Sequence, residues 1–206
     1  QCLIKLSDAA DGSPSDQSDN TFSISPEVQL YNIAGMVIYN RSDIPIGNAN
    51  VKLYQDAGLV NTAVSNFDGS YIIYDVEPGS YTLMIEKNDG WGGSMASDAL
   101  EVALYEVNPD STFLPDELSI SAGWVTLFGT GPSSSDALSI LNRSVNNINE
   151  YNVADWMFGE VDLIVSSSDL QAEITGICAG DAKSDYDPSG LLGKSNLTVN
   201  YDDLLK

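Results

Sequence analysis

One pattern occurs twice in this chain, over residues 93–107 and again over residues 131–145. When the two copies are shifted by 38 positions, they share a glycine, a Ser-Asp-Ala-Leu run and a valine. The Ser-Asp pair suits a helix N-terminus, where side-chain oxygens accept backbone N–H groups that have no partner inside the helix. The sequence therefore predicts two related helices, each preceded by a glycine-bearing loop.

The apolar residues of each predicted helix recur at helical spacing and so fall on one face. They are Leu100, Ala103, Leu104 and Val107 in the first helix, and Leu138, Leu141 and Val145 in the second. Each helix is too short to be stable alone, so we expect the two apolar faces to pack together. We interpret Asp98 and Asp136 mainly as helix caps.

The charge balance excludes several classes of function. The chain has 8 basic and 30 acidic residues, a formal net charge of −22, and no histidine. Phosphate binding needs clustered Lys and Arg, so we predict no nucleic-acid partner. The absence of histidine removes the commonest general base and the nucleophile pairs built on it, and we predict no enzymatic activity. No apolar run approaches the ~20 residues that span a bilayer, so we predict no membrane insertion.

Residues 29–87 have the rhythm of an all-β domain. Short apolar or alternating runs follow one another, separated by turn residues such as the Asp-Gly pair at 68–69 and the Pro-Gly pair at 78–79. This spacing predicts a small antiparallel β-sandwich. The order Ile-x-Gly-x-Val, Pro-Ile-x-Asn-Ala-x-Val-x-Leu, Asp-Gly-x-Tyr and Pro-Gly-x-Tyr-x-Leu resembles the carboxypeptidase regulatory-like domain, a transthyretin-like fold related to collagen-adhesin B-type domains. The resemblance implies a spacer.

The remaining β-like segments lie outside that domain. Residues 1–25 read as two short strands, which either close an immunoglobulin-like domain or are exchanged with another module or chain, because two strands cannot hold a core alone. Runs at 156–158, 161–165 and 172–178 also read as strands, and 191–206 reads as the start of a further β-module. We expect a strand or covering loop between Asn108 and Thr130.

Residues 88–190 resemble a degenerate dockerin module, in which calcium-binding loops lead into helices that begin Asp-Ala-Leu. That resemblance implies docking to a cohesin-like partner through Ala96, Ser97, Ser134 and Ser135, which precede the two helix aspartates. Counting back from Asp98 along the first loop, only Asp89 and Asp98 could coordinate calcium, and Lys87 holds the first ligand position. The second loop lacks the ligands.

A later turn carries three carboxylates, Asp181, Asp185 and Asp187, within seven residues. Calcium takes six to eight oxygen ligands, and such a cluster can supply several of them. The alternative is a solvated acidic turn. The run Asp110-Ser111-Thr112 resembles a bacterial O-glycosylation acceptor, which would make Ser111 a modification site.

Together these features predict a mainly β chain with a small α+β part: a β-sandwich followed by a two-helix, dockerin-like module with flanking strands. We expect a non-catalytic, structural segment of a secreted or cell-surface modular protein. It would fix the geometry of neighbouring modules or join subunits into an extracellular assembly. The alternatives are docking to a cohesin-like domain through the paired helices, or an accessory region of a secreted hydrolase or adhesin.

Overall fold

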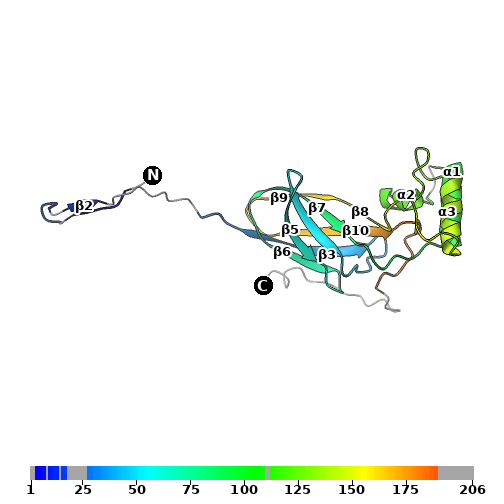
Figure 1. The fold of residues 1–206 in the computed structure, drawn as a ribbon, viewed down its shortest axis with the longest axis horizontal. Helices are drawn as coiled ribbons and strands as arrows, with labels where there is room; N and C mark the ends of the chain where they lie inside the picture. Colours follow the sequence, from blue (N-terminus) through cyan, green and yellow to red (C-terminus); the bar gives the residue numbers. More distant parts are fainter. Residues whose placement is uncertain (1–2, 8, 14, 18–26, 110–111, 190–206) are drawn as a thin grey trace.

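The computed structural model describes residues 3–7, 9–13, 15–17, 27–109 and 112–189. Two four-stranded sheets form its main body (Figure 1). The first sheet has the order β6 (Ser70–Val76), β3 (Tyr31–Tyr39), β10 (Leu170–Cys178) and β8 (Trp156–Phe158). The second has the order β5 (Gly58–Val64), β4 (Asn50–Gln55), β7 (Gly79–Glu86) and β9 (Val161–Val165). The predicted mainly β fold is confirmed.

The two sheets pack face to face around one hydrophobic core. Inward-facing side chains of β3 and β10, among them Val37 and Ile174, share this core with Leu53 of β4 and Leu83 of β7. All strand pairs in these sheets are antiparallel except β3 with β10, which run parallel. The alternation of buried and exposed residues along β4 and β7 is that of strands with one face on a core.

The sandwich does not end at residue 87. Its strands β8, β9 and β10 come from residues 156–178, which the sequence pattern had grouped with the helices. Without them, β3 and β7 would each have an unpaired edge inside the fold, because β10 lies beside β3 and β9 beside β7. The boundary predicted at residue 88 therefore falls within the sandwich, and the helices form an insertion between β7 and β8.

A glycine allows the central parallel pair to approach closely. Gly35 of β3 lies opposite Ala172 of β10, and a Cβ atom on Gly35 would overlap the carbonyl oxygen of Ala172. The same carbonyl accepts a hydrogen bond of 2.7 Å from the buried Tyr71 hydroxyl. Only glycine fits such a contact between neighbouring backbones.

Three helices gather at one end of the sandwich: α1 (Ala96–Val107), α2 (Glu117–Gly123) and α3 (Ser134–Ser144) (Figure 1). Two of them are the duplicated helices, as predicted. The third corrects the expectation of a strand or loop between residues 108 and 130. Asp116 precedes this helix and caps it, because its side chain accepts the N–H of Ser119 at 2.8 Å. The apolar residues of the segment had suggested a strand instead.

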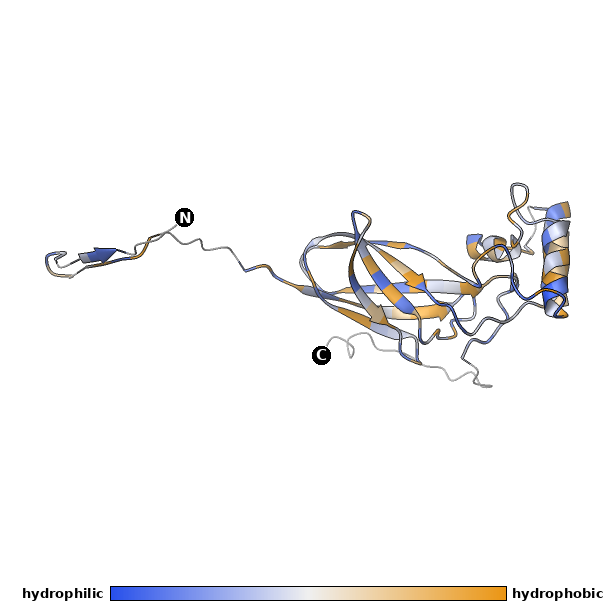
Figure 2. Cartoon of the chain, in the orientation of Figure 1, coloured by the Kyte–Doolittle hydropathy of each residue, from blue (hydrophilic) through white to orange (hydrophobic). Residues whose placement is uncertain are grey.

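Helices α1 and α3 contact each other, but not through the predicted apolar faces. Their buried residues are Asp98, Ala99 and Val102 in α1, and Asp136, Ala137, Ile140 and Arg143 in α3. Together with Leu114, Val125 and Ala179 they form a second, smaller core. Each helix carries two apolar stripes, and the one with the smaller side chains is buried. Since both stripes are apolar, hydropathy alone does not tell which one is buried. Figure 2 shows hydrophobic and hydrophilic residues alternating along the helices.

At the opposite end from the helices, β1 (Lys5–Ser7) and β2 (Ser15–Gln17) form a separate two-stranded hairpin (Figure 1). The expected strand near residue 22 and the module starting at residue 191 lie outside the described residues. Among the described residues, no helix has both the length and the apolar character needed to cross a bilayer.

Candidate functional site

Three carboxylates from distant parts of the sequence converge where the helices meet the sandwich. Asp98 lies in the first turn of α1, and Asp181 and Asp185 lie in the loop that follows β10. One oxygen from each of the three lies within 4.8 Å of the others. Asp98 and Asp181 are fully buried, whereas Asp185 is exposed. We call these three residues the acidic cluster. It brings together two ligands predicted in the later turn, Asp181 and Asp185, with Asp98, which was predicted as a ligand at the start of the first helix.

Hydrogen bonds hold Asp181 at the end of the sandwich. The hydroxyl of Tyr39, at the end of β3, donates to Asp181 Oδ2 at 2.6 Å. The backbone N–H groups of Asp185 and Tyr186 also donate to the Asp181 carboxylate, at 3.3 and 3.1 Å. Burial raises the pKa of Tyr39 far above its ordinary value, so its phenol remains a donor at neutral pH. Asp181 therefore organises the turn that contains it.

Asp98 links helix α1 to the same turn. Its Oδ2 accepts the N–H of Met95, the residue that precedes the helix, at 2.9 Å, as expected for a helix cap. Its Oδ1 accepts the N–H of Lys183 at 3.0 Å. Burial is the main cause that raises the pKa of Asp98 to about 7, and the nearby Asp181 contributes to this shift. Burial likewise raises the pKa of Asp181. Two buried carboxylates this close favour either a shared proton or a cation.

The donor set suits a hard cation in type, because carboxylate oxygens are the ligands that calcium prefers. One feature opposes it: the Lys183 ammonium lies 3.6 Å from Asp185 Oδ2 and already supplies a positive charge there. The other predicted ligands lie outside the acidic cluster in the described part of the chain. Asp187 accepts the N–H and hydroxyl of Ser189, and Asp89 pairs with Lys87 at 2.7 Å.

The second copy of the repeat uses its aspartate in the same way. Asp136 is fully buried, and its Oδ2 accepts the N–H of Ser133, the residue that precedes α3, at 3.0 Å. Its Oδ1 accepts the N–H and the hydroxyl of Thr126, each at 2.8 Å. Each aspartate thus caps its own helix with one oxygen and binds another segment with the other. That segment is the loop after β10 for Asp98 and the connection between α2 and α3 for Asp136. Their interpretation as caps is confirmed.

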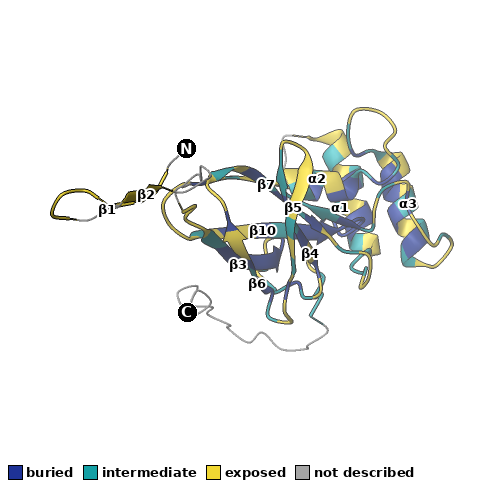
Figure 3. Cartoon of the chain, turned by 60° about the vertical axis from the view of Figure 1, so that its left-hand side comes forward, coloured by how far each residue is buried: buried dark blue, intermediate teal, exposed yellow. Residues whose placement is uncertain are grey.

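Ala103 packs against the second core, but the other apolar residues predicted to join the two helices form an exposed surface. We call it the helix-pair face: Leu100, Leu104 and Val107 of α1, with Leu138, Leu141 and Val145 at the corresponding side of α3. The exposed fractions of Leu100 and Leu138 are both 59%, and those of Val107 and Val145 are 83% and 57%. Buried and exposed residues separate onto opposite sides of these helices in Figure 3.

The end of α1 lies beside the start of α3. The Glu106 carboxylate, in the last turn of α1, accepts the N–H of Ser134 at the start of α3 at 2.8 Å, so the helices run antiparallel. Two contacting antiparallel helices that bury the same positions are related by an approximate two-fold axis normal to their plane. On each helix the exposed apolar residues lie on the side away from the buried ones.

The four predicted partner-contact residues lie at the helix starts beside this face. Ala96, Ser134 and Ser135 are exposed, and Ser97 is half-buried. Ser111, the predicted glycosylation site, lies outside the described residues.

Arg143 has a structural role that sequence reasoning missed. It is buried in α3, its guanidinium carbon lies 3.5 Å from the ring centroid of Trp91 and 4.4 Å from that of Tyr151, and Nη1 lies 2.8 Å from Asp155 Oδ1. This cation–π stack ties α3 to the segments that enter and leave the insertion. The available indication was a basic residue in an acidic chain, one turn beyond the apolar position Ile140.

Residues 32–94 match the family model of the carboxypeptidase regulatory-like domain. The match covers β3 to β7 and stops before α1, so the similarity to this family extends over the first five strands of the sandwich. This part of the predicted resemblance is confirmed. No curated protein matches the chain.

Several solved structures show weak similarity. They include the T6 backbone pilin of Streptococcus pyogenes, with 23% identity, a TM-score of 0.28, and coverage of 31% of this chain and 14% of the pilin. A DUF3823 protein from Parabacteroides merdae has 9% identity, a TM-score of 0.36, and coverage of 74% and 48%. A DUF3823 protein from Bacteroides ovatus has 25% identity, a TM-score of 0.26, and coverage of 31% and 33%. The chain spans less than half the length of each.

Proposed function

We propose that this chain is a non-catalytic, structural module of a secreted or cell-surface protein, and that its helix-pair face docks a partner within an extracellular assembly. The insertion would be a dockerin-like helix pair carried on a spacer sandwich. The partner is a neighbouring module, another subunit or a cohesin-like domain. The regulatory-like family match supports the spacer role, and the exposed helices support the docking role.

The observation that carries the proposal is the exposure of six large apolar side chains on two rigid helices. Each such side chain gains about 1.5–3 kcal/mol when it is transferred fully from water to an apolar contact. Contiguous apolar surface on a soluble protein marks an interaction site more often than chance exposure does. The capping and cation–π contacts fix the helices in place, so the face is preformed and loses little conformational entropy on binding.

The non-catalytic part rests on the state of the carboxylates. The pKa values of Asp98 and Asp181 are raised by burial, but both side chains have zero exposed fraction and already accept backbone N–H groups. A general acid or base must reach a substrate proton directly or through one water molecule. These two carboxylates hold the fold together instead.

Surface plasmon resonance with purified cohesin-like domains and with neighbouring modules tests the docking role. The double variant Leu100→Ser/Leu138→Ser removes one exposed leucine from each helix of the helix-pair face without touching the buried stripe. We expect it to weaken binding at least tenfold. Leu59→Ser, at an equally exposed leucine on β5, is the matched control and should bind as the wild-type chain does. Equal binding by all three proteins would contradict the proposal.

Calcium binding by the acidic cluster is a second proposal, supported by the convergence of Asp98, Asp181 and Asp185. Calcium bound there would neutralise the buried pair and fasten α1 to the loop after β10. It would stabilise the docking surface rather than take part in a reaction.

A further inference from the structure

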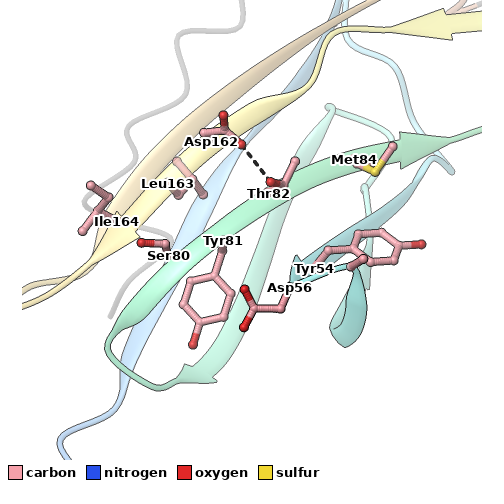
Figure 4. Close-up of a pocket in the computed structure, with 10 residues that line it drawn as sticks. Tyr54, Asp56, Ser80, Tyr81, Thr82, Met84, Asp162, Leu163 and Ile164 are labelled. Carbon is pink, nitrogen blue, oxygen red and sulfur yellow. Dashed lines mark hydrogen bonds between the residues drawn. The ribbon is translucent and has the colours of Figure 1, made fainter.

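A broad hollow lies on the sandwich, on the outer face of the second sheet. It is an open groove of about 820 Å³ lined by residues of β4, β7 and β9 and by the β4–β5 turn. Figure 4 shows these side chains on neighbouring strands. The helices gather at the end of the sandwich rather than over this face (Figure 1). We propose that this groove binds a neutral saccharide.

A row of three side chains crosses the floor of the groove. Tyr54 of β4 pairs in register with Thr82 of β7, and Thr82 with Asp162 of β9. The Thr82 hydroxyl donates to Asp162 Oδ1 at 2.8 Å, as drawn in Figure 4. This bond orients the carboxylate, and its second oxygen has no donor among the described residues. An aromatic ring on β4 and an oriented acceptor on β9 thus stand on either side of β7 in a rigid sheet.

The lining combines the two properties that a sugar requires. Tyr54 and Met84 supply apolar surface on which the C–H face of a sugar ring can lie, and Ile164, 72% exposed, extends that surface to the sheet edge. Asp162 and Asp56 supply carboxylate oxygens that accept hydrogen bonds from sugar hydroxyl groups. Few polar groups on a largely apolar surface are typical of small-molecule sites.

The charges of the groove select against other ligands. No lysine or arginine lines it, so phosphorylated or sulfated ligands meet two carboxylates and no cation. The nearby Lys52 pairs with Glu86. The groove is open to solvent, whereas a wholly apolar ligand needs an enclosed cavity. A lysine-rich peptide would be attracted to the carboxylates, but it would leave the Tyr54 and Met84 surface without a matching apolar group.

Affinity electrophoresis in native gels tests the proposal. The full chain is run through gels containing, in turn, a β-glucan, a xylan, starch and a galactomannan. We expect at least one polysaccharide to retard the wild-type chain. We expect Tyr54→Ala to weaken that interaction at least tenfold and Asp162→Asn to weaken it several-fold. Tyr74→Ala, at a tyrosine 57% exposed on β6 of the other sheet, is the matched control and should be retarded as the wild-type chain is.

Either of two gel results would overturn the saccharide assignment. One is migration that none of the four polysaccharides affects. Another is retardation that Tyr54→Ala leaves unchanged while circular dichroism shows a folded chain. A calorimetric result would also overturn it: an oligolysine peptide binds at 0.15 M salt, Asp162→Asn abolishes that binding, and no polysaccharide retards the chain. The Leu100→Ser/Leu138→Ser variant should retain saccharide binding, which separates this proposal from the docking role.

Discussion

At the scale of single residues, the Asp98 carboxyl couples the stability of the insertion to pH. Its pKa in the folded chain is about 7, against 3.8 as an ordinary carboxyl. Between these values the unfolded chain releases the proton while the folded chain retains it. The contribution of this carboxyl group to the free energy of unfolding is therefore fully present below about pH 4, and it is lost as the pH rises towards 7.

Asp98→Asn removes this titration, so its effect on stability should depend on pH. The free energy of unfolding of the wild-type chain, minus that of Asp98→Asn, should fall by about 1 kcal/mol per pH unit between pH 4 and 7. Urea denaturation at each pH measures both values. Asp187→Asn, at an acid outside the acidic cluster, is the control. A difference that stays constant over this range would show that Asp98 ionises normally in the folded chain.

A second residue-scale prediction concerns the β4–β5 turn. Asp56 and Ala57 have φ angles of 48° and 65°, as the two-residue turn requires, and Ala57 carries a Cβ that disfavours this region. Ala57→Gly should stabilise the chain by up to about 1 kcal/mol in urea denaturation. Ala63→Gly, within the neighbouring strand β5, should destabilise it. Destabilisation by both changes would contradict the turn conformation.

At the scale of elements, the loop after β10 determines whether the acidic cluster binds calcium. Calorimetric titration should show calcium binding and a higher melting temperature, both lost in Asp185→Asn. Lys183→Asn removes the competing ammonium and should tighten binding about tenfold, because a unit charge this close contributes about 1–4 kcal/mol near a surface. No heat and no change in melting temperature, in the wild-type chain and in Lys183→Asn alike, would rule out the site.

At the scale of the whole molecule, the sandwich is completed by strands from both sides of the helical insertion. A fragment of residues 27–94 contains the entire family match but lacks β10 beside β3 and β9 beside β7. We expect it to be unfolded, since the core loses Ile174, Ile177 and Val165 and two buried strands lose a neighbour. Residues 27–189 should unfold cooperatively by circular dichroism. A cooperative transition in the shorter fragment would show that the first five strands are a domain by themselves.

Much of this architecture could be predicted from local pattern. Turn residues and alternating hydrophobicity located the strands from β3 to β10 because strand formation depends on short-range spacing. The repeated Ser-Asp-Ala-Leu located α1 and α3 because a helix cap is a local interaction. The helix α2 was missed, since its cap at Asp116 precedes only seven helical residues.

What only the tertiary structure decided depends on contacts between distant residues. The pattern of residues 172–178 predicts a strand, but it does not predict which strands lie beside it. In the fold this segment belongs to β10, which pairs in parallel with β3 and completes the sandwich. Each helix carries two apolar stripes, and the sequence pattern favoured the one that contains Leu100 in α1. The fold buries the other stripe, which contains Ala99 and Val102. Asp98 and Asp181 are far apart in the chain, and only the return of β10 to the helices makes them one cluster. The sequence by itself determined the elements, because their causes are local; the sheet order, the exposed helix face and the acidic cluster required the complete fold.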